Sequence, residues 1–371
     1  MRRGVLAAIA ALVLVASATS AVPLCDYRSP ETDLSDLSIG FAYQYYNDPF
    51  SEDRDVNQGQ FSVDYERIFD QPVFGYDIRL ENDMEISVLD VSTYTTFADG
   101  NYKRYFAAEG DYFAFAGATA RSSSSYQSLA LSVSFGVGFG RFVDVTPLAR
   151  ATRIDEYLYS SGSLVDHLHP VDLQILADEI GSLTTYDSVA ALLEAVQDVL
   201  EGSGYVKVEG LDALDISEIT RLIQEEGFSR YCGWDLKIGL GYEVLDPSGG
   251  ESDLLITGAF NYAFATTPNE QFLIQGSFSG LPEFLEQNRI DATIGYDCLL
   301  SDFLAAAVSY DFSRETWIGE PRDMHRIGLE LTMNPLDTAE VTFSVVFEHE
   351  GPEIYEEWLV DLKLSIGFEL L

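Results

Sequence analysis

The chain has 371 residues, a formal net charge of −40 and a sequence pI of about 4.1. Nucleic acids and anionic lipid headgroups are bound through Lys and Arg, so this charge balance argues against both as partners. Hydrophobic residues nevertheless make up 47% of the chain and aromatic residues 13%, which excludes a disordered acidic protein. A large apolar surface therefore coexists with a large acidic one.

Residues 1–21 are typical of a secretory signal peptide. Arg2 and Arg3 precede an apolar run, and small residues around Ala18 and Ala21 offer cleavage positions. The run is short for a membrane-spanning helix, and an uncleaved signal anchor is the alternative. Cys25 follows Leu24 rather than the small residue that lipoprotein processing needs, so we expect no lipid anchor there.

Residues 22–142 carry apolar side chains at every second position, as half-buried strands do. The clearest segment is 128–141, where Leu, Val and Phe alternate with Ala, Ser and Gly. We predict about six strands here, in the segments 37–46, 60–69, 74–80, 85–95, 105–117 and 128–141.

The period changes to that of helices over residues 143–230. Thr146 and Pro147 are typical of a helix start, Pro170 opens a second helix that stops at Gly181, and a third stops at Gly202. A fourth helix, with Asp215 and Glu218 spaced as a capping box, stops at Gly227. Each helix has one apolar stripe, so the four can form a small bundle. This insert is either a plug or a module outside the barrel, and we favour the module.

Strand alternation resumes in residues 231–371. We predict eight more strands, in the segments 234–244, 253–264, 271–278, 289–298, 304–312, 325–332, 340–348 and 358–371. Short connections follow the second, fourth and sixth of these strands, and longer connections, including 313–323, follow the others. Transmembrane barrels show this alternation of short turns and long loops.

The two faces of these strands differ in chemistry. One face is apolar, with aromatic residues near the strand ends, as in an interfacial girdle: Tyr45, Phe264, Phe278, Phe312, Phe347 and Trp358. The other face is rich in Gly, Ser, Thr, Asp and Glu. Small polar and charged groups suit a wet interior.

Together these features resemble a Gram-negative-type outer-membrane β-barrel protein of the porin-like kind. The resemblance implies an all-β transmembrane antiparallel up-and-down β-barrel of about 14 strands (roughly 12–16), with a four-helix insert between the sixth and seventh strands. It implies that the last strand pairs with the first and that the chain end is periplasmic. The insert then lies on the periplasmic side or folds up into the lumen. The final aromatic residue is Phe368, whereas many such barrels end on an aromatic residue and this chain ends on Leu371.

Cys25 and Cys232 would then lie on the same side of the membrane and could form a disulfide, which leaves Cys298 over. Three unpaired thiols are the alternative.

Charged residues on the polar face are the candidate functional groups. The lumen-facing candidates are Asp64, Glu66, Asp77, Arg79, Asp235, Lys237, Glu243, Asp291, Asp297, Asp311, Arg326, Glu330, Asp361 and Lys363. Carboxylates outnumber cations, and carboxylate-lined pores favour cations. The alternative is that the acidity is global, or that pairs such as Asp361 and Lys363 only cross-link the wall.

Histidines give little support for an enzyme. His325 and His349 share the parity of the apolar face, so we expect them to point outward at the barrel rim, away from any lumenal substrate. His167 and His169 flank a helix start, where capping is the usual role. We expect no catalytic residues, no metal and no cofactor.

The sequence therefore predicts an exported outer-membrane channel of a diderm bacterium for passive diffusion of small solutes, with a preference for cations. Its expected partners are outer-membrane lipid, small solutes or cations and, through the helical insert, periplasmic or envelope proteins. The alternative function is a structural or assembly protein whose barrel anchors a periplasmic helical module.

Overall fold

The structure, a computed structural model, describes residues 22–30, 32–46, 56–87, 90–182, 185–225, 228–246, 252–282, 287–301, 303–317, 320–336, 339–351 and 358–368. The predicted signal peptide, residues 1–21, lies outside the described residues.

In the described part of the chain, fourteen strands form one antiparallel sheet in which each strand pairs with the next along the chain. Their bounds are β1 (Thr32–Tyr46), β2 (Val56–Asp70), β3 (Phe74–Ser87), β4 (Asp90–Tyr105), β5 (Tyr112–Ser123), β6 (Ala130–Asp144), β7 (Tyr231–Leu245), β8 (Leu254–Thr267), β9 (Glu270–Gly280), β10 (Gln287–Ser301), β11 (Leu304–Trp317), β12 (Glu320–Leu336), β13 (Ala339–Glu350) and β14 (Leu359–Phe368). This order confirms the predicted up-and-down topology, and four helices separate the sixth strand from the seventh, as predicted.

Two of the predicted strands were placed wrongly. The segment 85–95 spans the end of β3 and the start of β4, and the segment 105–117 spans the end of β4 and the start of β5. Apolar residues continue through the first of these connections, with Val88 and Leu89 where a turn residue would be expected. Period-two alternation alone therefore could not locate the turn.

One predicted long connection is mostly strand. β11 continues to Trp317 and β12 begins at Glu320, so most of the segment 313–323 belongs to the hairpin instead of a loop. Direct pairing of Arg314 with Asp323 extends the ladder through polar residues. The predicted insert boundary also moves slightly, since β6 runs through Asp144.

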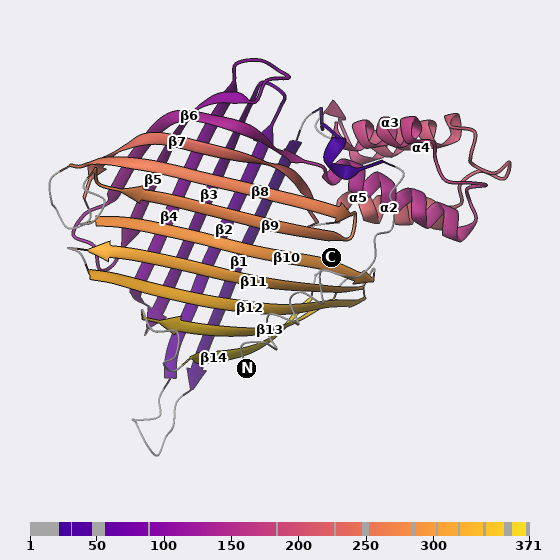
Figure 1. Ribbon diagram of the computed structural model, residues 1–371. Helices are drawn as coiled ribbons and strands as arrows, with labels where there is room; N and C mark the ends of the chain where they lie inside the picture. The colour runs from indigo at the N-terminus through magenta and orange to yellow at the C-terminus, as the bar shows by residue number, and fades with distance from the viewer. Residues whose placement is uncertain are drawn as a thin grey trace, which may run out of the picture.

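The sheet curls on itself: in Figure 1 the indigo and purple strands β1–β5 pass behind the orange and yellow strands β7–β13. Side chains from β1–β4 and from β6–β10 line one common interior cavity, which places these strands on opposite walls. The predicted seam differs, because among the described residues β1 pairs with β2 and β14 pairs with β13, without a ladder between β1 and β14. Local alternation does not encode closure, which depends on the stagger and tilt of the whole sheet.

Large apolar side chains remain exposed on the outer face of the sheet. Examples at mid-strand are Phe41, Phe135, Val137, Ile238 and Leu362, each exposed by 58% or more. Exposed apolar side chains occur on β1, β6, β7 and β14, whereas water-soluble monomers rarely expose large apolar patches.

The helical insert consists of α2 (Thr146–Ser161), α3 (Pro170–Gly181), α4 (Val189–Gly202) and α5 (Ala213–Gln224). Its apolar stripes meet in a core in which Leu148, Ile154, Leu176, Leu192 and Leu200 are fully buried. The helices lie together at one end of the strands, outside the curled sheet (Figure 1). We call this the insert end of the sheet and the opposite one the far end. No described helix is long and apolar enough to cross a membrane.

The N-terminal segment completes this helical core. Val22, Leu24 and Tyr27 are 5% exposed or less and pack within the same cluster. Leu24 is the first residue of the short 3-10 helix η1 (Leu24–Asp26). The Tyr27 hydroxyl donates a hydrogen bond of 3.1 Å to Asp178 of α3. Residues 22–27 therefore pack as part of the helical unit.

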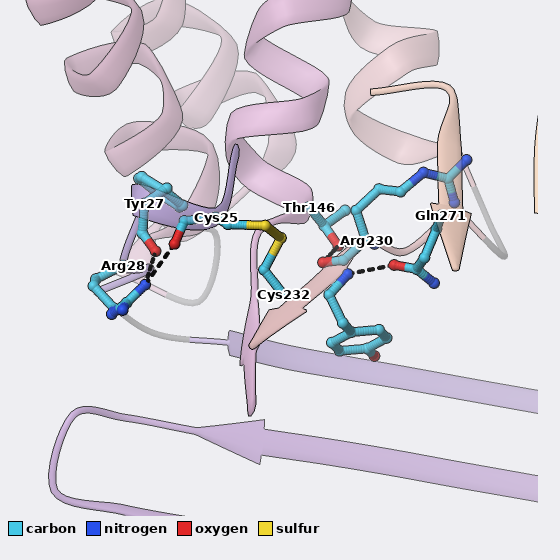
Figure 2. The surroundings of a disulfide bond; sticks show 8 residues. Cys25, Tyr27, Arg28, Thr146, Arg230, Cys232 and Gln271 are labelled. Atoms are coloured by element: carbon cyan, nitrogen blue, oxygen red, sulfur yellow. Dashed lines mark hydrogen bonds between the residues drawn. A yellow bond between two sulfur atoms is a disulfide. The ribbon is translucent and has the colours of Figure 1, made fainter. Parts of the chain in front are cut away.

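Several bonds join the helical unit to the sheet. A disulfide links Cys25 to Cys232 at the start of β7, and the Arg230 backbone N–H donates to the Thr146 hydroxyl at 2.8 Å (Figure 2). Gly140 and Gly233 sit close to this junction with φ of 102° and 92°, where a Cβ would lie 2.3 Å from a carbonyl oxygen of the neighbouring strand. Only glycine fits these two bends, through which β6 and β7 meet the insert.

Candidate functional site

A polar cavity of about 570 Å³ occupies the interior of the sheet toward the insert end. Its lining comes from β1–β4, from β6–β10 and from Ser229 just before β7. Among the described residues, no residue of α2–α5 lines this cavity. The described helices therefore do not fill it.

The charge of the cavity lining is strongly negative. Six carboxylates line it, from Glu66, Asp70, Asp77, Asp144, Asp235 and Asp291, and two ammonium groups, from Lys103 and Lys237. The difference, six minus two, is a formal excess of four negative charges. Acidity is therefore concentrated in the sheet interior as well as distributed over the chain.

Hydrogen bonds between directly opposite strand positions fix three of these six carboxylates. Asn101 donates to Asp77 at 2.9 Å, and Asn261 donates to Asp235 at 2.8 Å. The Ser313 hydroxyl donates to Asp291 at 2.8 Å. An amide or hydroxyl thus satisfies one carboxylate oxygen and leaves the negative charge in place.

An ion pair crosses three strands at the insert end. Asp70, Gly75 and Lys103 stand in register on β2, β3 and β4, and the Lys103 ammonium donates to Asp70 at 3.1 Å. A Cβ on Gly75 would lie 2.3 Å from Asp70 Oδ1 and 2.9 Å from Lys103 Cε. The glycine therefore leaves the space in which the two charged side chains meet over the middle strand.

Five of the fourteen predicted lumen residues line the main cavity: Glu66, Asp77, Asp235, Lys237 and Asp291. Arg79 lines an adjoining cavity of about 200 Å³, together with Glu66, Asp77, Phe97 and Asp99. Arg79 also forms an ion pair with Glu81.

The other eight predicted residues lie outside these two cavities. Asp297 pairs with Arg230 at 2.7 Å, and Asp311 accepts from Thr293 at 2.8 Å. Arg326 stands between Asp311 and Glu348 in register, Glu330 and Lys363 both face Ser344, and Asp361 faces Val346. Asp64 faces Ser38 and Glu81, and Glu243 faces Ser132 near the far end.

Several cavity-lining residues from the N-terminal half of the chain are absent from the predicted lumen-facing set. Asp70, Asn101 and Lys103 have interior positions, but β4 was not recognised as one strand. The signal is present in β4 itself, where Phe97, Asp99, Asn101 and Lys103 alternate with Ala98, Gly100, Tyr102 and Arg104. Correct placement of the turns before and after β4 would have found it.

On β6 and β7, part of the inner face that carries glycines is covered by aromatic rings and not by water. A Cβ on Gly138 would lie 2.1 Å from the Phe113 ring, and a Cβ on Gly136 or Gly239 would lie 2.8 Å from the Phe115 ring. Phe113 is fully buried. The glycines of β6 and β7 thus give room for inward aromatic side chains of β5, and this wall of the interior is apolar.

Aromatic contacts follow the outer face at both ends of the strands. At the insert end, ring centroids are 5.1 Å apart for Phe69 and Tyr76, 4.8 Å for Tyr112 and Phe139, and 5.4 Å for Phe139 and Trp234. At the far end, Phe312 lies 5.2 Å from His325. The side chain of Tyr45, a predicted girdle residue, lies outside the described ones.

His325 and His349 belong to the far-end aromatic cluster. The Tyr310 hydroxyl lies 2.8 Å from His325 Nδ1, and His349 stacks between His325 and Trp358. Both histidines are buried, at 7% and 2% exposure, so they are packed within this cluster instead of exposed at the rim. No group of three His, Cys, Asp or Glu side chains among the described residues is arranged to hold a metal.

Burial shifts several titratable groups of the helical unit. Desolvation raises the pKa of the Tyr27 phenol and of the Asp178 carboxyl that accepts its hydrogen bond. Desolvation also lowers the pKa of Arg230, against the opposing effect of its partner Asp297. His167 pairs with Asp155 at 2.7 Å, and the His169 ring accepts from the Val171 N–H at the start of α3.

Comparisons with known proteins add little. No family model matches the chain, and no curated protein matches it. Among solved structures, the chain is similar to the CymD monoaromatic hydrocarbon channel at 8% sequence identity, over 93% of this chain and 90% of that one, with a TM-score of 0.27. A TM-score this low carries no argument about fold or function.

Proposed function

We propose that this protein is an outer-membrane channel through which small solutes diffuse passively, with a preference for cations. The observation that carries the proposal is the polar cavity, enclosed by opposite walls of the curled sheet and lined by six carboxylates against two lysines. Carboxylates that line a pore lower the energy of a cation inside it and raise that of an anion.

The outer face of the sheet supports a membrane as the surrounding solvent. Contact with water is unfavourable for large exposed apolar side chains, whereas contact with hydrocarbon is not. Such side chains on the outer face include Phe135, Val137, Ile238 and Leu240. Aromatic contacts near both strand ends match the two interfacial girdles of outer-membrane barrels.

Lipid also sets a condition on the sheet edges. Unpaired backbone groups cost several kcal/mol each in hydrocarbon, so the proposal requires β1 and β14 to pair there. Hydrogen exchange of the protein in lipid vesicles tests this condition. Slow exchange of the amides of both strands is expected, and fast exchange in either strand would contradict closure.

Conductance in planar bilayers tests the function. Purified protein should give stepwise currents, and the reversal potential in a KCl gradient should show K⁺ preferred over Cl⁻. The double variant Asp77→Asn/Asp235→Asn should weaken this preference, because two lining charges are removed. The matched control is Glu194→Gln/Asp198→Asn on the exposed face of α4, which removes the same charge far from the cavity. Absence of current steps, or equal shifts in both variants, would contradict the proposal.

The second candidate is a structural protein whose barrel anchors the helical insert. It is favoured by one observation: the insert has its own buried core and is tied to the sheet by a disulfide, yet it contributes no residue to the described cavity. Asp144 and Tyr231 face each other in register, so a two-residue turn can replace residues 145–230. A channel predicts that this deletion leaves the conductance in place, whereas a purely structural protein predicts no current before or after it.

A further inference from the structure

Lys103 holds a position in the cavity that differs from that of the second lysine. Its ammonium donates to Asp70 at 3.1 Å, its side chain is 18% exposed, and the Tyr105 ring centroid lies 5.6 Å away. Asp235 of β7 lines the same cavity as Lys103. Lys237 lines the same cavity without an ion pair to any of the described residues.

The carboxylates around Lys103 need a cation. Asp235 is only 2% exposed, and Asp70 Oδ1 is buried without a hydrogen-bond partner among the described residues. Carboxylates held with little exposure to water are costly to ionise unless a positive charge lies near them. The Lys103 ammonium supplies that charge from β4.

We infer that Lys103 is a specificity-determining residue of the proposed channel: its ammonium occupies, on a tether, the position that a monovalent cation would take at Asp70 in the carboxylate-lined cavity. This inference rests on the proposed function. The ligand class follows from the Asp70 carboxylate, which already accepts a hydrogen bond from a primary ammonium group. A permeating K⁺ or a small alkylammonium ion therefore competes with Lys103 for the same oxygens.

The decisive comparison is between Lys103→Met and Lys237→Met. Each variant removes one positive charge from the same cavity at nearly constant side-chain length. If only total charge mattered, both would raise the K⁺/Cl⁻ permeability ratio equally. A tethered ion in the binding position predicts a larger rise for Lys103→Met, about five-fold over the unmodified protein, because a unit charge next to the permeating ion is lost.

A second readout detects the vacated position itself. In Lys103→Met, the K⁺ conductance should saturate at lower KCl concentration, and methylammonium chloride should reduce the K⁺ current in a saturable way. Neither effect is expected in Lys237→Met. Lys103→Arg keeps the charge and should retain the original permeability ratio.

Folding is controlled separately, because Lys103→Met leaves Asp70 buried and unpaired. Thermal melting in detergent identifies a variant that does not fold. If Lys103→Met does not fold, the single variant Asp70→Asn serves as the reference. The double variant Asp70→Asn/Lys103→Met must then have a higher K⁺/Cl⁻ permeability ratio than this reference. Equal effects of Lys103→Met and Lys237→Met, with no saturable block, would overturn the inference and leave the proposed channel intact. Absence of current in every variant and in the unmodified protein would overturn the proposed function instead.

Discussion

The sheet and the helical insert place similar apolar residues in opposite environments. In the insert, Leu148, Ile154 and Leu200 are fully buried against each other. In the sheet, Phe135 and Ile238 are about three-fifths exposed, and the polar groups turn inward toward a cavity. The insert therefore buries its apolar side chains, as water-soluble proteins do. The sheet instead exposes apolar side chains on its outer face and places polar ones in its interior. This contrast indicates two different solvents along one chain.

The largest expected effect concerns the insert core. Leu148→Ala removes a fully buried side chain and should lower the free energy of unfolding of the helical unit by about 2–5 kcal/mol. Urea titration followed by hydrogen exchange of the α2–α5 amides measures this. The control, Val171→Ala on the exposed face of α3, should change it by less than about 0.5 kcal/mol. Similar losses in both variants would remove the distinction between core and surface in the insert.

The disulfide tests whether the insert is held as part of the barrel. Cys25 and Cys232 are separated by 207 residues, so their link constrains a long loop of the unfolded chain. Replacing both with Ser should destabilise the helical unit by about 2–4 kcal/mol and release the N-terminal segment from its core. Limited proteolysis at residues 22–30 reports the release, and Cys298→Ser is the control. Unchanged protection of the segment would show that packing alone holds it.

A charge on the outer face tests the solvent of the sheet. Ile238→Arg places a cation at the middle of β7 and should cost about 2–4 kcal/mol of folding free energy in lipid vesicles. Ile175→Arg, on an exposed position of α3, should cost less than about 0.5 kcal/mol. Denaturant titration in vesicles measures both. Two equally small costs would place the outer face of the sheet in water.

The smallest effect is a pH dependence confined to the insert. Burial raises the pKa of Asp178 above its unfolded value, so the folded unit binds the proton more tightly. Its contribution to stability is therefore fully present below the unfolded pKa and is lost as pH rises through the folded pKa. Asp178→Asn, which keeps an acceptor for Tyr27, should remove this loss and make the unit slightly more stable at neutral pH. Unfolding titrations on both sides of the transition, with Asp198→Asn as control, measure it. A pH slope that survives in Asp178→Asn would assign the dependence to another group.

Alternation along a strand predicts some of the residues that line the interior, but not all of them. Asp235 and Lys237, predicted by counting alternate positions from Trp234, both line the cavity, and nothing interrupts β7 between them. Lys103 was missed because the turns on either side of β4 carry weak signals. The disulfide partner of Cys25 depended on the topology of the whole chain, since Cys232 lies 207 positions away.

The sequence alone determined which residues alternate, where the period changes from strand to helix, and how many strands follow one another. These are local properties, written in the spacing of apolar side chains and in helix-start and helix-stop residues. Only the tertiary structure decided which carboxylates share a cavity, that Asp70 and Lys103 meet over Gly75, and that Phe113 covers Gly138. Such contacts depend on register and on the curvature of the whole sheet, because both bring together side chains from strands that are far apart in the chain.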